Sequence, residues 1–226
     1  MTKVLRLTAS LLGLSIVGAL PCAAQTRAPL FVSGSVGTFS VRADNVDGQS
    51  AAVGVAGGIA VSRVVDVAIE WVRPTSAFTR SGTGLSVTFA PVGSSREEIE
   101  RLGVVSRFDH RREVIANFSA LVIVHPRFDN RVTPGLIVGI SSQRAREHFD
   151  VTPVSIPAGV DPQHPSVVAR QEATTRNLGA LVIGGNLAIA VTPRMFIVPE
   201  VRYDYGSIGD EINNVLRSSV GVMWRF

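Results

Sequence analysis

The chain has 226 residues and a formal net charge of +4, with 46% hydrophobic and 18% charged residues. These values exclude a disordered or fibrous chain and leave a globular or membrane protein of one domain, and so modest a charge gives no indication of nucleic-acid binding. Cys22 is the single cysteine, which excludes both a disulfide framework and a cysteine-based zinc site within the chain.

Residues 1–24 have the features of a secretory signal peptide. Lys3 and Arg6 precede an apolar stretch that is followed by small residues, and this stretch is shorter than the roughly 20 residues of a membrane helix. Pro21 occupies the position before Cys22, where lipid attachment favours a small residue, so a cleaved leader is favoured over a lipoprotein. We therefore predict an exported mature chain without cysteine and without a membrane helix.

After the leader, side chains alternate with a period of two, which is the pattern of β-strands with two different faces. In the run from Ala51 to Val61, branched residues alternate with glycine and alanine, and in residues 65–72 the apolar side chains alternate partly with acids. Eight such runs are present: 30–41, 51–61, 65–72, 113–124, 135–146, 175–191, 195–205 and 214–226.

Short and long connections alternate between these runs. The short ones are residues 62–64, 125–134 and 192–194, and the long ones are residues 42–50, 73–112, 150–174 and 206–213. This alternation is typical of outer-membrane barrels, which have short periplasmic turns and long extracellular loops, and several runs reach the 9 to 11 or so residues of a membrane-crossing strand. The prediction is an all-β fold: an eight-stranded antiparallel up-and-down transmembrane β-barrel over residues 25–226.

In five of the runs, apolar residues without charge occupy alternate positions, and we expect the face that they form to meet lipid. A soluble barrel would have the reverse arrangement, and the period alone does not distinguish the two. The residues expected to point outward are Leu30, Val32, Val36, Val53, Val55, Ile59, Val61, Val114, Ala116, Phe118, Ala120, Val122, Val124, Leu136, Val138, Ile140, Leu181, Ile183, Leu187 and Ile189.

The C-terminal strand carries a more specific pattern. Val220, Val222, Trp224 and Phe226 occupy alternate positions, and the chain ends on Phe226, whereas Ser218 departs from the pattern. This resembles the C-terminal signature of outer-membrane barrel proteins, and the whole mature chain resembles the eight-stranded OmpA/OmpX-type barrel superfamily. The resemblance implies location in the cell outer membrane of a Gram-negative-type bacterium, and recognition of the last strand, as an assembly signal, by the barrel assembly machinery.

If the apolar faces meet lipid, the opposite faces place charges in the lumen. Acids and arginines on neighbouring strands form bidentate pairs, and burial in a narrow lumen makes such pairing close to obligatory. Because an eight-stranded barrel encloses little more than its own side chains, we predict a plugged lumen. The predicted charge network comprises Asp66, Glu70, Glu113, Glu200, Arg202, Asp204, Arg217 and Arg225.

Catalysis has little support in the sequence. His110, His125, His148 and His164 are scattered and form no helical metal-binding pair. Glu147, His148 and Asp150 resemble an acid/base cluster, but such a group more often marks a solvated strand end. The sequence therefore predicts neither an enzyme nor a bound cofactor or metal.

The long loops and the aromatic residues complete the sequence-based expectations. Ser95 and Glu98 form a capping box that predicts a short helix over residues 96–102, ended by Gly103, and residues 84–90 are expected to extend a hairpin above the membrane. Interfacial aromatic anchors are expected at Trp71, Phe128, Tyr203, Tyr205, Trp224 and Phe226.

Three functions are compatible with these features. The first is an outer-membrane barrel with a structural or surface-interaction role, in contact with outer-membrane lipid and with no nucleic acid. The second is a narrow, porin-like channel for ions or small solutes, with the glycine and alanine residues of the second strand along a water-filled path. The third is a soluble secreted barrel that binds a small apolar ligand in its interior.

Overall fold

The structure is a computed structural model of the chain. It describes residues 30–43, 46–88, 94–126, 131–158, 160–161, 163, 167, 169–208 and 211–226. The expected leader, Cys22, Phe128 and His164 lie outside the described residues.

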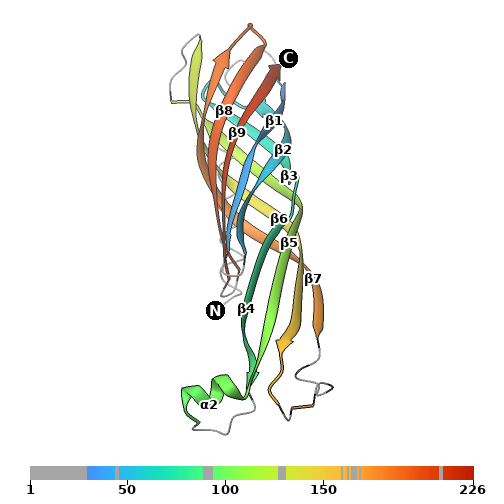
Figure 1. The fold of residues 1–226 in the computed structure, drawn as a ribbon. Helices are drawn as coiled ribbons and strands as arrows, with labels where there is room; N and C mark the ends of the chain where they lie inside the picture. The colour runs from blue at the N-terminus through green and yellow to red at the C-terminus, as the bar shows by residue number, and fades with distance from the viewer. Residues whose placement is uncertain are drawn as a thin grey trace.

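The described chain forms one antiparallel sheet that closes on itself (Figure 1). Its strands are β1 (Leu30–Ala43), β2 (Asp47–Ala60), β3 (Val65–Pro74), β4 (Phe78–Thr88), β5 (Gly103–Val124), β6 (Val132–Ser155), β7 (Arg170–Ala190), β8 (Met195–Ile208) and β9 (Glu211–Arg225). Sequence neighbours other than β3 and β4 pair around the ring, β1 pairs with β9, and β3 closes the ring by pairing with β5. The topology is therefore up-and-down.

The strands β3 and β4 share one position in the ring. Val65 to Val72 of β3 pair with residues 117–124 of β5, and β4 pairs with residues 103–112 of the same strand. The interruption follows Pro74, which has no N–H to donate; there the Thr75 N–H donates to the Ala51 carbonyl oxygen at 2.8 Å. The ring thus has eight strand positions, which confirms the predicted eight-stranded antiparallel barrel.

The two ends of the barrel differ. At one end, here called the turn end, short connections such as residues 61–64 join the strands, and Phe226 donates its N–H to the Leu30 carbonyl oxygen at 2.9 Å. At the other end, β4 and its neighbours continue beyond the ring (Figure 1). This part, here called the extension, comprises residues 79–88, 103–111, 148–155 and 170–173, paired side by side.

The extension corrects the predicted loop lengths. Residues 73–112, expected to be one long loop, contain β4, a helix and the first half of β5. β5 has 22 residues and β6 has 24, well beyond the roughly 9 to 11 needed to cross a membrane. The pattern missed these segments because both of their faces carry polar residues, so that no apolar alternation marks them as strands.

The short helix α2 spans Arg96–Arg101, as the capping box predicted. The Ser95 hydroxyl accepts a hydrogen bond from the Glu98 N–H at 3.3 Å. Acids in the first turn and Arg101 in the last turn favour the helix through its dipole. No helix in the described part of the chain is long and apolar enough to cross a membrane.

The outer face of the barrel carries the apolar side chains. Ile69 and Leu181 are 69% and 64% exposed, and every strand of the ring contributes such residues, whereas the charged side chains of Glu70, Arg202 and Arg217 are buried inside. This exposed apolar surface of the ring is here called the apolar belt, and large apolar surface of this kind marks contact with lipid or a partner. The face assignment made from the sequence is thus confirmed on most strands.

A β-bulge on β5 overturns that assignment at two residues. Val114 was expected outside but is 2% exposed and lies opposite the buried Ala145 inside the barrel, whereas Ala116 lies opposite Arg144, which is exposed on the outer face. The register shifts between these two residues, and an extra residue in one strand exchanges its faces. Glu113, expected in the lumen, instead lies opposite Arg146 in the strand register, and Arg146 is exposed on the outer face.

Apolar side chains also fill part of the lumen. Near the turn end a buried cluster contains Phe31, Leu121 and Ile137, and near the extension a second contains Phe39 and Phe78, whose ring centroids are 6.1 Å apart. A Cβ at Gly58 would lie 2.4 Å from Phe31 Cζ. The small residues of β2 thus make room for large side chains.

Candidate functional site: the charged lumen and the open extension

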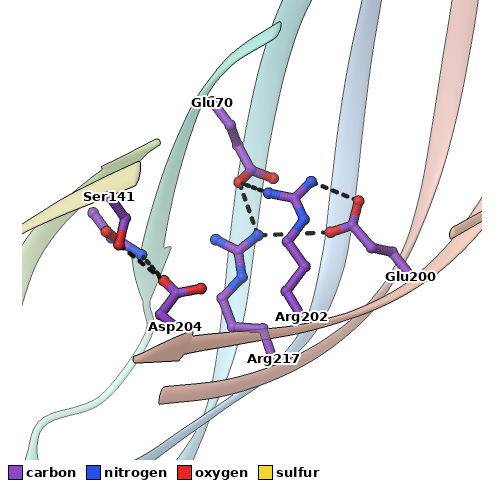
Figure 2. A network of polar contacts seen from close by, with 7 residues as sticks. Glu70, Ser141, Glu200, Arg202, Asp204 and Arg217 are labelled. Carbon is purple, nitrogen blue, oxygen red and sulfur yellow. Dashed lines mark hydrogen bonds and ion pairs between the residues drawn. The ribbon is translucent and has the colours of Figure 1, made fainter. Parts of the chain in front are cut away.

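Two acids and two arginines meet in the middle of the lumen (Figure 2). Glu70 of β3 accepts hydrogen bonds through Oε2 from Arg202 Nη1 at 2.6 Å and from Arg217 Nη2 at 2.8 Å. Glu200 of β8 accepts from Arg202 Nη2 at 2.5 Å and lies 3.6 Å from Arg217 Nη2. All four side chains are buried. The central cluster, Glu70, Glu200, Arg202 and Arg217, is therefore balanced in formal charge.

Asp204 lies beside the central cluster and is held by neutral groups. Its Oδ2 atom accepts from the Ser141 hydroxyl at 3.2 Å and from Asn117 Nδ2 at 3.4 Å. Ser141 and Asn117 come from β6 and β5, so these bonds connect the far wall of the barrel to β8 (Figure 2).

A second charged group lies nearer the turn end. Asp66 Oδ2 is 3.0 Å from His125 Nε2 and accepts from Arg225 Nη2 at 2.7 Å. The other ring nitrogen of His125 is 3.2 Å from the Pro134 carbonyl oxygen. The Arg225 guanidinium also lies 5.5 Å from the ring centroid of Phe196, within the range of cation–π attraction.

A third charged group lies in the lumen next to the extension. Arg112 of β5 pairs with Glu147 Oε1 of β6 at 2.5 Å and donates to Asn213 Oδ1 at 3.0 Å. Asn213 Nδ2 in turn donates to Gln143 Oε1 at 2.9 Å. Arg176, which is partly exposed, reaches Glu147 at 3.5 Å. The polar contacts thus span the barrel interior from β5 to β9.

The structure places all of the predicted lumen residues in these groups except Glu113. It also adds His125, Arg112 and Glu147, which sequence reasoning did not assign to the lumen. Arg112 was missed because the bulge brings it, rather than its neighbour, to the inner face. A signal for His125 existed, since it follows directly on the alternating run that ends at Val124.

Small cavities remain beside the central cluster. One of about 50 Å³ is bordered by Glu70 and Arg202, and one of about 10 Å³ by Arg217 and Gly54. Arg202 Nε and Arg217 Nη1 are buried without a hydrogen-bond partner among the described residues. Cavities of this size have room for single waters, since one water needs about 10–15 Å³.

The inner face of the extension is open instead of filled. A pocket of about 530 Å³ lies between the extended strands. Phe149 lies 6.2 Å from Phe108 between ring centroids, nearly parallel to it, and 5.9 Å from His110 in an edge-on arrangement. Arg80, Arg176 and Glu172 border the same pocket. The pocket therefore offers an aromatic floor with charged sides.

The outer face of the extension carries an exposed ion pair. Arg107 lies 3.0 Å from Asp109 Oδ2. The hydrogen bond from Ser81 and the neighbouring Arg107 lower the pKa of the Asp109 carboxyl below its ordinary value. Asp109 therefore stays ionised at neutral and mildly acidic pH.

The acid/base cluster suggested by the sequence does not form. Glu147 is buried in the lumen, whereas His148 pairs with the outward Arg111 on the opposite face of the strand. In the described part of the chain, no group of three or more His, Cys, Asp or Glu side chains is placed to hold a metal ion.

Comparisons with known proteins find similar structures at low sequence identity. No protein-family model and no curated protein match the chain. Neisserial surface protein A is 13% identical over 87% of this chain and 97% of its own, with a TM-score of 0.48. The N-terminal β-barrel domain of Pseudomonas aeruginosa OprF is 13% identical over 86% of this chain and 97% of its own, with a TM-score of 0.42. A major outer membrane protein of Thermus thermophilus is 12% identical over 88% of this chain and 99% of its own, with a TM-score of 0.47. The chain is similar to these structures over nearly their whole length, and its own strand pairing establishes the eight-stranded barrel.

Proposed function

We propose that the protein is an outer-membrane barrel with a closed lumen that presents its extension at the cell surface for interaction. One contrast carries this proposal: the barrel interior is occupied by paired charges and apolar clusters, whereas the extension holds an open pocket of about 530 Å³. Binding sites concentrate in segments that a rigid scaffold holds in place.

The distribution of polarity supports a membrane location. Apolar side chains such as Ile69 and Leu181 are exposed on the outside, and ion pairs such as Glu70 with Arg202 lie inside. A soluble barrel that binds an apolar ligand needs the opposite arrangement, with an apolar interior and a polar exterior. The alternating apolar residues that lead to Phe226 are all exposed on the outer face of β9 and its end, where the assembly machinery would read them.

Closure of the lumen follows from the cost of breaking its ion pairs. A continuous water path through the middle must pass the cluster of Glu70, Glu200, Arg202 and Arg217, in which both arginines bind both acids. Separating a buried pair leaves charges without compensation, and removal of one partner typically costs about 3–5 kcal/mol. We therefore expect the purified protein not to conduct.

A narrow channel is the second candidate. The two small cavities and the unpartnered nitrogens of Arg202 and Arg217 lie in the same central layer of the described barrel. Rotation of an arginine into such a space would open a path for water or a small ion.

Conductance in planar lipid bilayers distinguishes the two candidates. The closed-lumen proposal expects no steady conductance steps from the wild-type protein. Steps that change when Glu70 is replaced by Gln or Arg202 by Gln, and that stay unchanged for Arg107→Gln in the exposed pair of the extension, would establish the channel instead.

The surface role is tested by locating the extension in intact cells. A protease site or epitope inserted after Ser95, at the start of the exposed helix α2, is expected to be accessible from outside. The same insertion after Arg63 in a short turn serves as the matched control and is expected to be protected. The reverse result would place the turn end outside and end the proposal.

A further inference from the structure

Four arginines gather on the outer face where the apolar belt meets the extension. Arg73 lies on β3, Arg111 on β5, and Arg144 and Arg146 on β6, and all four side chains are exposed. The strands β3, β5 and β6 are neighbours in the ring. These four residues are called the arginine rim below.

The rim lies just beyond the apolar belt. Trp71 precedes Arg73 by two residues and lies opposite Phe118 in the register. On β6, Ile140 is followed on the same face, toward the extension, by Ser142 and then Arg144. Alternate residues share a face and are separated by about 6–7 Å along a strand. The guanidinium groups therefore lie at the depth of lipid headgroups if the belt lies in the hydrocarbon.

A groove on the outer face is lined by two of these arginines. It measures about 520 Å³ and lies where the third strand position is interrupted between β3 and β4. The groove is lined by Arg73, Arg111, Glu113, Ser76 and apolar residues including Val53, which belongs to the belt. It thus joins cationic and hydroxyl groups to an apolar surface.

The rim arginines have no charge partner in the described part of the chain. None of them forms an ion pair with another described residue, in contrast to Arg202 and Arg217 in the lumen, which are paired with acids. Glu113 is the acid in the groove, and it offsets one of the four positive charges. A net positive surface of this kind is suited to an anionic ligand.

The rim arginines are clustered on neighbouring strands. On the outer face, β8 presents Tyr203 and Tyr205 and β9 presents Leu216. Arg42 of β1 is also exposed, and it lies opposite Asp47 of β2 in the register. The four rim arginines thus form a local group of positive charge beside the groove.

We propose that the arginine rim binds the phosphate groups of a phosphorylated glycolipid in the outer leaflet. The planar guanidinium binds phosphate through two parallel hydrogen bonds, and arginine is favoured over lysine where this geometry matters. The groove would take the phosphorylated sugar headgroup, with its acyl chains along Val53 and the belt. The choice of an outer-leaflet lipid rests on the proposed orientation of the extension, whereas the phosphate chemistry does not.

The test compares a rim variant with a turn-end variant in lipid nanodiscs. In the rim variant Arg73, Arg111, Arg144 and Arg146 are each replaced by Gln, and in the control Arg63 and Arg194, exposed in the short turns, are replaced by Gln. Each protein is reconstituted with phosphatidylcholine and a small fraction of bisphosphorylated lipid A, and retained lipid A is measured by native mass spectrometry. A heat-dependent shift in gel mobility verifies that each variant is folded.

We expect the rim variant to retain at least about fivefold less lipid A than wild type, because the loss of a single arginine at an anionic surface already has an effect of about that size. The control should match wild type, lipid A without phosphates should not be retained, and Glu113→Gln should increase retention. Equal retention of lipid A by the rim variant and wild type would overturn the proposal. If phosphatidylglycerol, added in place of lipid A, were retained equally well, the assignment of the ligand as a glycolipid would be overturned. Because nanodiscs fix no cellular orientation, these results are independent of whether the extension is found outside the cell.

Discussion

The barrel body and the extension use the same strands for opposite purposes. In the body, eight strand positions close into a ring, and each inward side chain meets others across a narrow interior, as Glu70 meets Arg202 and Arg217. In the extension, four strands continue without the rest of the ring, and their inner face holds an open pocket. The contrast indicates that closure of the ring, more than composition, decides whether inward side chains fill an interior or border an open pocket.

Disruption of the central cluster is expected to change stability most. Replacement of Arg202 by Ala leaves Glu70 and Glu200 with less compensation in a buried site, so the free energy of unfolding is expected to fall by about 3–5 kcal/mol. Arg107→Ala in the exposed pair of the extension is expected to cost at most about 1 kcal/mol. Urea unfolding in lipid vesicles, followed by tryptophan fluorescence, measures both. Equal losses would mean that the two regions do not differ in this respect.

The second expected effect concerns the outer face. Ile183→Arg, at an exposed position of the apolar belt, should cost roughly 2–4 kcal/mol if the residue lies near the bilayer midplane. Val154→Arg, at an equally exposed position of the extension, should stay within about 0.5 kcal/mol because that side chain meets water. The same unfolding assay applies, and an unaffected Ile183→Arg variant would show that the belt does not face hydrocarbon.

A third contrast uses two glycines. A Cβ at Gly58 would come within 2.4 Å of Phe31 Cζ and of the Val67 carbonyl oxygen, whereas a Cβ at Gly82 of the extension would meet nothing within 4 Å among the described residues. Gly58→Ala should therefore destabilise the barrel by about 1–3 kcal/mol through overpacking. Gly82→Ala should be neutral in the same measurement, and a neutral Gly58→Ala would mean that the interior has more room than its packing indicates.

The smallest equilibrium effect is expected at the C-terminus. Phe226 is 67% exposed and adds one backbone hydrogen bond, to Leu30, so its deletion should change the unfolding free energy of the finished barrel by only about 1 kcal/mol. Its assembly in cells should nevertheless fall clearly, because the last strand is expected to be the segment that the assembly machinery reads. Surface levels of the deletion variant and of Phe226→Trp, which keeps an aromatic residue, separate the role of Phe226 in stability from its role in assembly. Normal levels without Phe226 would contradict the assembly signal.

Local patterns in the sequence predicted much of this molecule. Alternation marked all eight strand positions of the ring, although not β4, because a strand between lipid and a packed interior must change polarity at every residue. The helix α2 was predicted from Ser95 and Glu98, because a capping interaction involves residues three apart. The inward direction of Glu70, Arg202 and Arg217 followed from the same alternation.

Local patterns also failed in two places with clear physical causes. The first half of β5 has polar residues on both faces, so the extension had no apolar period to reveal it. The bulge between Val114 and Ala116 exchanged the faces of β5, so Glu113 was assigned to the lumen in place of Arg112. A single inserted residue has no signature in composition, because its effect is defined only against the partner strand.

The alternation of residues was enough to predict strands with an apolar and a polar face and the aromatic residues Trp224 and Phe226 on the apolar face of the last strand. Which charges meet depends on the tertiary structure, since Glu70 contacts Arg202 and Arg217, which lie 132 and 147 residues away in the chain. The tertiary structure also decided that the rim arginines gather on neighbouring strands and that four strands leave the ring. Register and closure set these distances, and both arise from the pairing of whole strands around the barrel.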